Sequence, residues 1–508
     1  MSNFSHSASR REFLRRAGVL SVAGPAAPFA LNLAGIGSAS AQSAGGYKAL
    51  VCLFLYGGND AYNMVLATDP GSWANYLTVR NQAPDPISLK APGTAPVATA
   101  GAGSSDRLGG VLAITPLRDQ GRSFAVHPVM TGVRDLFAAK RLAILPNVGP
   151  LLRPTTKAQY KDSAFPKPPK LFSHNDQQST WQAYAPEGAT AGWGGRMGDL
   201  LASANSKAVF TSISASGNAV WLSGQAVLQY QVSNNGAIRI GGSGSTLFGS
   251  ATALSKMRDI MRTARSQHLL EQDHAAVVGR SIDAEANLSA ALPVANAAPH
   301  GTPGLAGGTV DPLLQYDNPL TGGKSTNPLA QQLQIVSRTI AARTALGVQR
   351  QVFFVSMGGF DTHDGQNRTQ ADNMARLSHA LKYFDNTLTA MGVGNEVTTF
   401  TASDFGRTFT SNGDGTDHGW GSHHFILGGA VRGGDLYGNF PAYGVSDARG
   451  EFGSPNQIGN GSLVPEVSVD QYAATLGRWF GVSDGQLLDL FPNLANFDAG
   501  ARNLGFLG

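Results

Sequence analysis

Carboxylate and imidazole side chains follow three apolar segments of the sequence, at the point where each segment ends. The first segment ends in GGND, which contains Asp60; the second ends in GGFDTH, with Asp361 and His363; the third ends in SDFGR, with Asp404 and Arg407. Carboxylate oxygens and imidazole nitrogens are ligands of divalent metal ions. Paired glycines before the acids let the backbone turn sharply and approach a bound group closely.

A histidine-rich segment, GDGTDHGWGSHH, follows the third of these ends, and five of the 11 histidines lie between positions 363 and 424. An Asx turn alone would explain any one of these motifs. The presence of such motifs at several strand ends favours one shared polar site. We expect a divalent metal there (Zn, Mn, Fe, Mg or Ca), because oxygen and nitrogen ligands suit these ions and no thiolate lies nearby to make a soft site. Neighbouring residues of an extended chain face opposite ways, so at most one of His423 and His424 is expected to point into the site. The candidate ligands are Asp60, Asp361, His363, Asp404, His418 and His423.

The segment LFSHNDQQSTWQ offers a nucleophile, Ser173, three residues before Asp176. This spacing is similar to a capping box at the start of a helix, where the helix field favours a phosphate or sulfate. A metal ion lowers the pKa of such a hydroxyl and makes it a nucleophile. The alternative is that Ser173 only caps the helix. Arg407 and Arg196 are candidates to hold an anion.

The apolar segments predict strands buried on both faces, because they are continuous rather than alternating. Strands are expected at 48–56, 141–146, 208–214, 351–357 and 396–402. Helices are expected at 129–140, 173–184, 197–204, 252–292, 329–346, 371–391 and 469–480. The fold class is therefore α/β, with a mostly parallel central sheet sandwiched by helices. Such sheets bind ligands beyond the carboxyl ends of their strands, where the acids and histidines lie.

The N-terminus has the pattern of a twin-arginine signal peptide over residues 1–41. SRREFL contains Arg10 and Arg11, an apolar stretch covers about 17–33, and ASA at 39–41 is a peptidase site. We expect export of the folded chain to the periplasm or beyond, with the twin-arginine translocase and signal peptidase as partners. A stray arginine pair or an uncleaved anchor is the alternative.

Charge and cysteine content limit the partners and the means of stabilisation. Residues 1–41 hold four Arg and one Glu of the chain's 38 Lys+Arg and 34 Asp+Glu, which leaves 34 against 33, a net charge of +1. This balance, without a basic stripe, gives no support to nucleic-acid binding. The single Cys52 forms no internal disulfide and is expected in a buried strand. A large core or a metal must then hold the protein.

Residues 42–508 are expected to form one domain. Long Pro/Gly-rich loops extend it at about 82–124 and 294–328. An insertion at about 219–292 is expected to contain a β-hairpin followed by helix.

Five motifs resemble the exported bacterial "domain of unknown function 1501" family, over nearly the whole of residues 42–508. They are LFLYGGNDAYN, LFSHNDQQSTWQ, GWGGRMGDLL, FFVSMGGFDTHDGQ and TASDFGRTFTSNGDGTDHGWGSHHFILGGAV. The family is grouped with the alkaline phosphatase and sulfatase-like superfamily. The resemblance implies a mostly parallel sheet between helices, a metal site at the strand ends, and hydrolysis of phosphate or sulfate esters by a Ser, Thr or modified Cys nucleophile.

The resemblance also implies roles for single residues. These are Asp60 as the ligand after the first strand, Ser173 as the nucleophile, Asp361 and His363 as one acid–histidine pair, Asp404 as the acid of a second, and His418 or His423 as the late histidine. Phe405 stands where the second pair has its histidine. The two-metal site of the superfamily is then reduced to one metal, rebuilt with Asp417 and His418, or lost.

Two functions follow from these residues. The first is a metal-dependent hydrolase of a small phosphate or sulfate ester. The alternative is a non-catalytic periplasmic binding or assembly protein that retains the fold and acts with another exported protein.

Overall fold

The computed structural model describes residues 45–239 and 246–508, so the predicted signal peptide at 1–41 lies outside the described residues. Within them, nine strands form one sheet. In spatial order they are β16 (Val467–Ser468), β5 (Leu142–Gly149), β13 (Ser422–Leu427), β12 (Val397–Ser403), β1 (Lys48–Leu55), β11 (Arg350–Met357), β6 (Ser212–Ser214), β7 (Tyr230–Ser233) and β8 (Gly236–Ala237).

The sheet is mixed and mostly parallel. β1 lies at its centre and pairs in parallel with β11 and β12, and β6 and β7 continue the parallel side. β13 runs antiparallel to both β12 and β5, and β7 forms an antiparallel hairpin with β8. The predicted α/β class with a mostly parallel sheet is therefore confirmed. β13 is not among the predicted strands, and the segment predicted at 208–214 is a strand only from Ser212, after the short 3-10 turn η3 (Ala208–Phe210).

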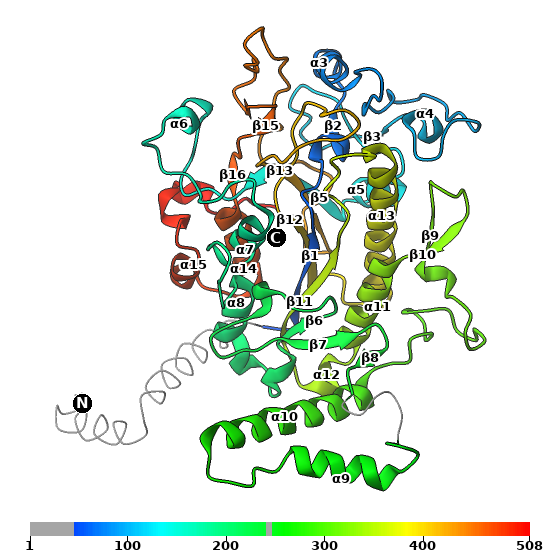
Figure 1. Cartoon of the computed structure of the whole chain (residues 1–508), viewed down its shortest axis with the longest axis vertical. Helices are drawn as coiled ribbons and strands as arrows, with labels where there is room; N and C mark the ends of the chain where they lie inside the picture. The colour runs from blue at the N-terminus through cyan, green and yellow to red at the C-terminus, as the bar shows by residue number, and fades with distance from the viewer. Residues whose placement is uncertain (1–44, 240–245) are drawn as a thin grey trace, which may run out of the picture.

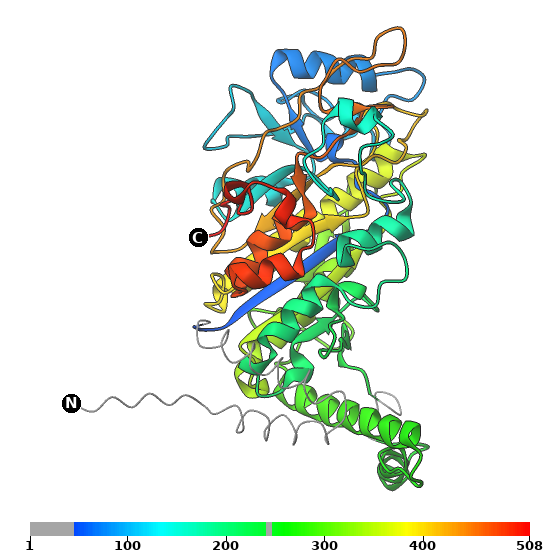
Figure 2. The same ribbon diagram turned by 90° about the vertical axis from the view of Figure 1, so that its left-hand side faces the viewer.

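Helices cover both faces of the sheet. Successive residues of β1 point to opposite sides, and because nearly all of them are apolar, both sides must be covered. One face packs on α5 (Thr131–Ala138), α11 (Pro328–Ala341) and α13 (Gln366–Ala390). The other packs on α7 (His174–Ala183), α8 (Trp193–Leu201), α14 (Val469–Phe480) and α15 (Asp484–Leu490). Figure 1 shows these two helical layers on either side of β1, and Figure 2 shows the same layers turned by 90°.

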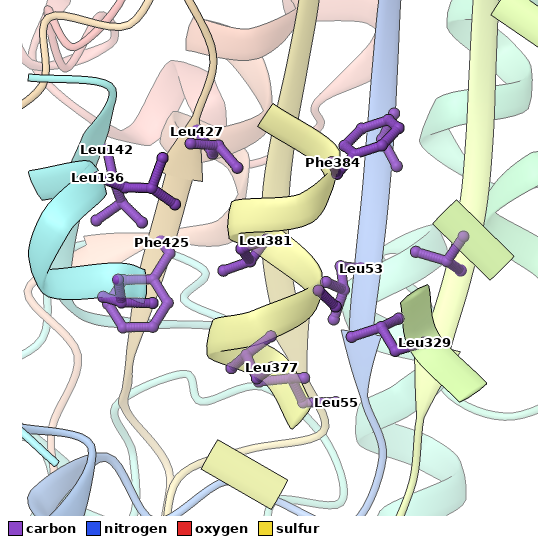
Figure 3. Close-up of a cluster of buried hydrophobic side chains, with 14 of the residues drawn as sticks. Leu53, Leu55, Leu136, Leu142, Leu329, Leu377, Leu381, Phe384, Phe425 and Leu427 are labelled. Carbon is purple, nitrogen blue, oxygen red and sulfur yellow. The ribbon is translucent and has the colours of Figure 1, made fainter. Parts of the chain in front are cut away.

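Leucine and phenylalanine side chains fill the space under α13. In Figure 3, Leu53 and Leu55 of β1 lie beside Leu377 and Leu381 of α13, with Phe425 of β13 further along the same face. Burying each such side chain contributes roughly 1.5–3 kcal/mol. On the opposite face of β1, Cys52 is a free, buried thiol, as predicted.

Short elements interrupt the two predicted long loops. The first region contains α4 (Ser105–Leu108) and β3 (Leu112–Ile114), and α3 (Pro70–Arg80) precedes it. β3 pairs with β4 (Phe124–Val126), which also pairs with β2 (Val65–Ala67), in a small antiparallel sheet. The second contains the hairpin of β9 (Gln315–Asp317) and β10 (Lys324–Thr326). The remaining short helices are α6 (Lys157–Lys161) and α12 (Arg343–Leu346).

The segment predicted to be helical, 252–292, contains two helices, α9 (Ala251–Met261) and α10 (Leu269–Ala291). Between them, the backbone N–H of Arg265 donates to the carboxylate of Glu271 at 2.6 Å, and the Ser266 hydroxyl donates to the same carboxylate. These bonds compete with the backbone hydrogen bonds of a continuous helix, so the helix is interrupted here. The two helices form an arm at one end of the molecule (Figure 2).

Among the described residues, no helix has both the length and the apolar character needed to cross a membrane.

Candidate functional site

Four side chains meet beyond the carboxyl end of the central strands: His174, Asp361, His363 and His418. His174 is the first residue of α7, Asp361 and His363 follow β11, and His418 belongs to the loop that joins β12 to β13. The cluster thus lies where parallel α/β sheets bind their ligands.

The ring nitrogens of the three histidines are in contact. Nε2 of His418 lies 3.1 Å from Nε2 of His174 and 3.0 Å from Nε2 of His363. Asp361 closes the cluster, with Oδ1 3.0 Å from Nε2 of His363 and 3.4 Å from Nε2 of His418, and Oδ2 3.4 Å from Nε2 of His174. A tetrahedral ion with bonds of about 2.0–2.1 Å holds its ligand atoms roughly 3.3 Å apart. The pairs in contact therefore have the spacing of ligands around a metal ion. The ligand atoms of His174, Asp361 and His418 all lie within 4.8 Å of one another, and His363 joins them through His418 and Asp361.

The outer nitrogen of each ring shows where its proton lies. The partners of Nδ1 are the carbonyl oxygen of Phe172 for His418 (2.7 Å), Oδ2 of Asp404 for His174 (2.7 Å) and Oδ1 of Asp417 for His363 (3.3 Å). Carbonyl and carboxylate oxygens accept hydrogen bonds, so each Nδ1 donates and each neutral ring has its lone pair on Nε2. The two Nε2···Nε2 contacts of His418 thus bring lone pairs together, and lone pairs cannot hydrogen-bond to one another. This arrangement, with an acceptor behind each ring, is typical of metal-binding histidines.

The electrostatic environment also favours a cation. The hydrogen bond to Asp404 outweighs burial and raises the pKa of His174. Burial lowers the pKa of His418 and keeps its ring neutral. Burial alone would raise the pKa of Asp361, but the hydrogen bond and charge of Arg407, 2.7 Å away, lower it. The cluster therefore combines a carboxylate of lowered pKa with one imidazole, His174, of raised pKa, and 45% of the Asp361 side chain is exposed to solvent.

Two glycines after β1 allow the strand ends to approach one another. At Gly57 (φ +114°), a Cβ atom would lie 2.4 Å from the backbone nitrogen of Asp361. At Gly58 (φ +80°), it would lie 2.4 Å from the ring of Phe405. That ring packs against the rings of His174 and His418, at centroid distances of 4.8 and 4.6 Å. Phe405 thus forms an apolar support behind two of the imidazoles and supplies no ligand.

A family model described as "Protein of unknown function (DUF1501)" matches residues 47–490. The chain belongs to the DUF1501 family. Among curated proteins, none matches it.

Asp404 lies behind the cluster of this DUF1501 protein rather than within it. Its buried Oδ2 accepts hydrogen bonds from Nδ1 of His174, from the backbone N–H of Gly57 at 3.1 Å and from Nε2 of Gln178 at 2.8 Å. An oxygen that accepts three hydrogen bonds has no lone pair free for a metal ion. Asp404 therefore orients His174 and completes a carboxylate–histidine pair.

Asp60 is likewise separate from the four clustered side chains. Its carboxylate is fully buried and forms a two-pronged ion pair with Arg80, at 2.5 and 3.0 Å. It also accepts from Gln366 at 2.7 Å, whose side-chain oxygen accepts from the hydroxyl of Thr416. Thr416 in turn accepts from Arg407, the partner of Asp361. Asp60 is thus linked to the cluster through buried hydrogen bonds only.

His423 and His424 point to opposite faces of β13, as the extended conformation predicts. His423 packs against Phe440, and its Nδ1 accepts from the backbone N–H of Asn147 at 3.1 Å. His424 packs against Trp181 on the other face. Both rings are buried in the core, so neither contributes to the cluster.

Ser173 lies next to the cluster in sequence, at the N-cap position of α7. Its hydroxyl donates to Oδ2 of Asp176 at 2.8 Å and makes no hydrogen bond to the helix backbone. The predicted helix start is present, but the capping interaction is replaced by a hydroxyl–carboxylate pair.

His174 is the candidate ligand that the sequence does not single out. It lies in the motif LFSHNDQQSTWQ, directly after Ser173, the predicted nucleophile. The signal that could have found it is positional, since a histidine at the first turn of a helix points its ring beyond the helix end. Phe172, with a left-handed backbone (φ 71°), directs its carbonyl at His418 from the same turn.

Proposed function

We propose that this protein binds one divalent metal ion through His174, Asp361, His363 and His418, and that it is a hydrolase of phosphate or sulfate esters. The observation that carries the proposal is that Nε2 of His418 meets Nε2 of both His174 and His363, while each of the three rings has an acceptor on Nδ1. Three imidazoles and one carboxylate suit Zn or Fe better than Mg or Ca. Such an ion supplies Lewis acidity to an ester oxygen or to water.

The residues of the chain account for the other requirements of ester hydrolysis. Ser173 is the proposed nucleophile, and the carboxylate of Asp176 accepts its hydroxyl proton. A water molecule on the exposed side of the cluster is the second nucleophile to test. Arg407 is fully buried and holds Asp361 in place, so its charge offsets negative charge that develops on the ester.

The same reasoning supports an alkaline phosphatase/sulfatase-like fold. The support is the mostly parallel sheet with helices on both faces and an acid–histidine cluster at the strand ends. Phe405 occupies space against His174 and His418, which favours one metal over the two of that superfamily.

Elemental analysis of protein purified without added metal tests the metal site. We expect one transition-metal ion per chain in the parent, and its loss in Asp361→Ala and His418→Ala. Asp364→Ala, at an exposed neighbour of His363, is the matched control and should retain the metal. Full metal content in both cluster variants would refute the site.

Turnover of aryl phosphates and aryl sulfates by the metal-loaded protein tests the hydrolase. Ser173→Ala separates the two nucleophiles: a loss of about 100-fold or more is expected for a serine nucleophile, and little change for water. Absence of turnover by protein with a full metal site would reject the activity and leave the metal site standing.

We propose that residues 1–41 direct export of the folded protein. Replacing Arg10 and Arg11 together by Lys should leave the precursor in the cytoplasm, in cell fractions probed with an antibody. Unchanged export of that variant would rule out the twin-arginine route.

A second candidate function, assembly with another exported protein, is favoured by the arm of α9 and α10. Its exposed apolar side chains include Leu269 and Leu270, with 79% and 75% of their surface accessible. Capture of a stoichiometric partner from periplasm, unaffected by Asp361→Ala but lost on replacing both leucines by Ser, would support binding over catalysis.

A further inference from the structure

A cavity of about 780 Å³ lies on the side of α13 that faces away from the central sheet. Its walls are α5, the outer face of α13 and the segment from Ala298 to Lys324. This volume is in the range of small-molecule sites, roughly 300–1,000 Å³. None of the four clustered side chains lines it.

Three polar side chains of α13 line the cavity in a row. His379, Lys382 and Asn386 occupy positions i, i+3 and i+7, so they lie on one face of the helix. A ligand that lies along this face of α13 would meet them in succession.

His379 presents a hydrogen-bond donor to the cavity. Asn327 caps α11, since its Oδ1 accepts from the backbone N–H of Leu329, so its Nδ2 must donate to Nδ1 of His379 at 3.1 Å. Burial, and then the charge of Lys324, lowers the pKa of His379, so the ring is neutral. Its only proton is therefore on Nε2.

Lys382 contributes a positive charge without a counter-ion. The two carboxylates in the cavity wall already have cations, since Asp135 pairs with Arg134 at 2.9 Å and Asp317 pairs with Lys324 at 2.7 Å. No ion-pair or hydrogen-bond partner of Lys382 is present within residues 45–239 and 246–508.

The segment from Ala298 to Lys324 gives the cavity an apolar, proline-rich part of its wall. It contains Pro299, Pro303, Pro312 and Leu313. Proline fixes its own backbone angle, so this wall loses little conformational freedom when a ligand binds.

We propose that this cavity binds a small amphipathic carboxylate, with the carboxylate group on Lys382 and Nε2–H of His379 and the apolar body against the proline-rich wall. Two donors one helical turn apart match the two oxygens of a carboxylate. The site is independent of the metal cluster and of the proposed hydrolysis.

Calorimetric titration with 2-naphthylacetate tests the proposal, with 2-(2-naphthyl)ethanol as the uncharged analogue. We expect saturable binding of the acid by the full chain, and binding of the alcohol that is at least about tenfold weaker. Lys382→Gln should weaken acid binding by a similar factor and leave alcohol binding unchanged. Lys256→Gln, at an exposed lysine on α9, is the matched control and should have no effect.

Two further measurements separate this site from the others. Asp361→Ala should bind the acid as the parent does, and His379→Phe, which removes the second donor, should weaken acid binding. Absence of saturable binding, equal affinity for acid and alcohol, or parental affinity in Lys382→Gln would each overturn the proposal.

Discussion

Asp404 contacts the candidate metal centre only through His174, and the centre should depend on that contact. In Asp404→Asn, the amide oxygen can still accept from His174, but the negative charge that raises the pKa of that ring is lost. We expect metal affinity to fall by about 10- to 100-fold. Competition with a chromophoric chelator measures the dissociation constant.

Asp364→Asn is the control for that measurement, because it removes one carboxylate near the cluster without touching an imidazole. A parental dissociation constant in Asp404→Asn would show that Asp404 is not coupled to the metal. A lower unfolding free energy with unchanged metal affinity would assign Asp404 to stability alone.

At the scale of elements, the turn after β1 decides how closely two loops approach. Gly58 and Gly93 have nearly equal φ angles, +80° and +82°, but a Cβ atom at Gly58 would strike Phe405 whereas one at Gly93 meets nothing within 4 Å. Alanine at Gly93 should cost about 1–2 kcal/mol for the left-handed backbone alone. Alanine at Gly58 should add roughly 1–3 kcal/mol of overpacking. Urea unfolding of the two variants compares these costs, and equal costs would contradict the contact.

Helix α14 contains a buried acid whose charge opposes folding. Burial raises the pKa of Asp470 to about 7, although the backbone N–H of Asn493 donates to it. The folded state then binds a proton that the unfolded state releases near pH 4, so this stability is full below pH 4 and is lost as the pH rises through 7. Relative to the parent, Asp470→Asn should gain up to about 4 kcal/mol of unfolding free energy between pH 4 and 8. Denaturant titrations at several pH values measure the gain.

The control is Asp489→Asn on the neighbouring helix α15, at an exposed position, where no such gain is expected. A constant difference between Asp470→Asn and the parent across this pH range would mean that Asp470 is ionised in the folded protein.

Local sequence patterns predict the elements of this fold better than their breaks. Continuous apolar runs identify β1, β11 and β12, because a strand that is buried on both faces is apolar at every position. The break between α9 and α10 depends on hydrogen bonds to Glu271 from residues several positions away. The spacing of apolar residues gives no sign of these bonds. β13 is missed because its segment, SHHFIL, is polar at one end, and only the tertiary fold buries His423 and His424.

For the candidate site, the sequence likewise predicts the location better than the role of each residue. Strand ends bring Asp361, His363 and His418 to one place, and the sequence predicts this from topology. Distinguishing a ligand from the residue behind it requires distances, which is why Asp404 and Asp60 are candidates in sequence but partners of His174 and Arg80 in the structure. His174 arrives from a helix rather than a strand end, outside the rule that finds the others.

The three regions with distinct chemistry lie on different parts of the molecule. The cluster of His174, Asp361, His363 and His418 is at the carboxyl ends of the strands, and the cavity lies on the outer side of α13. The arm of α9 and α10 forms one end of the molecule (Figure 1). None of them shares a lining residue with another. Variants in one region are therefore expected to add to variants in another, since distant sites without shared partners act independently.

Stability of the whole molecule in acid should depend on imidazoles that the core keeps neutral. Burial lowers the pKa of His127, His423 and His424 to about 3 each. Because these folded-state values lie below the unfolded value of about 6.5, the contribution of each is present above pH 6.5 and is lost as the pH falls toward 3. Between pH 7 and 5.5, each ring should lower the unfolding free energy by about 1.3 kcal/mol.

His127→Asn isolates one of these contributions. Its unfolding free energy should fall by about 1.3 kcal/mol less than that of the parent between pH 7 and 5.5, whereas His268→Asn, at the exposed start of α10, should follow the parent. Chelator-treated protein is needed, because the raised pKa of His174 acts in the opposite direction when no metal competes for that ring. Equal pH dependence in the parent and His127→Asn would show that acid reaches the core by local opening, since water then protonates His127 without unfolding the protein.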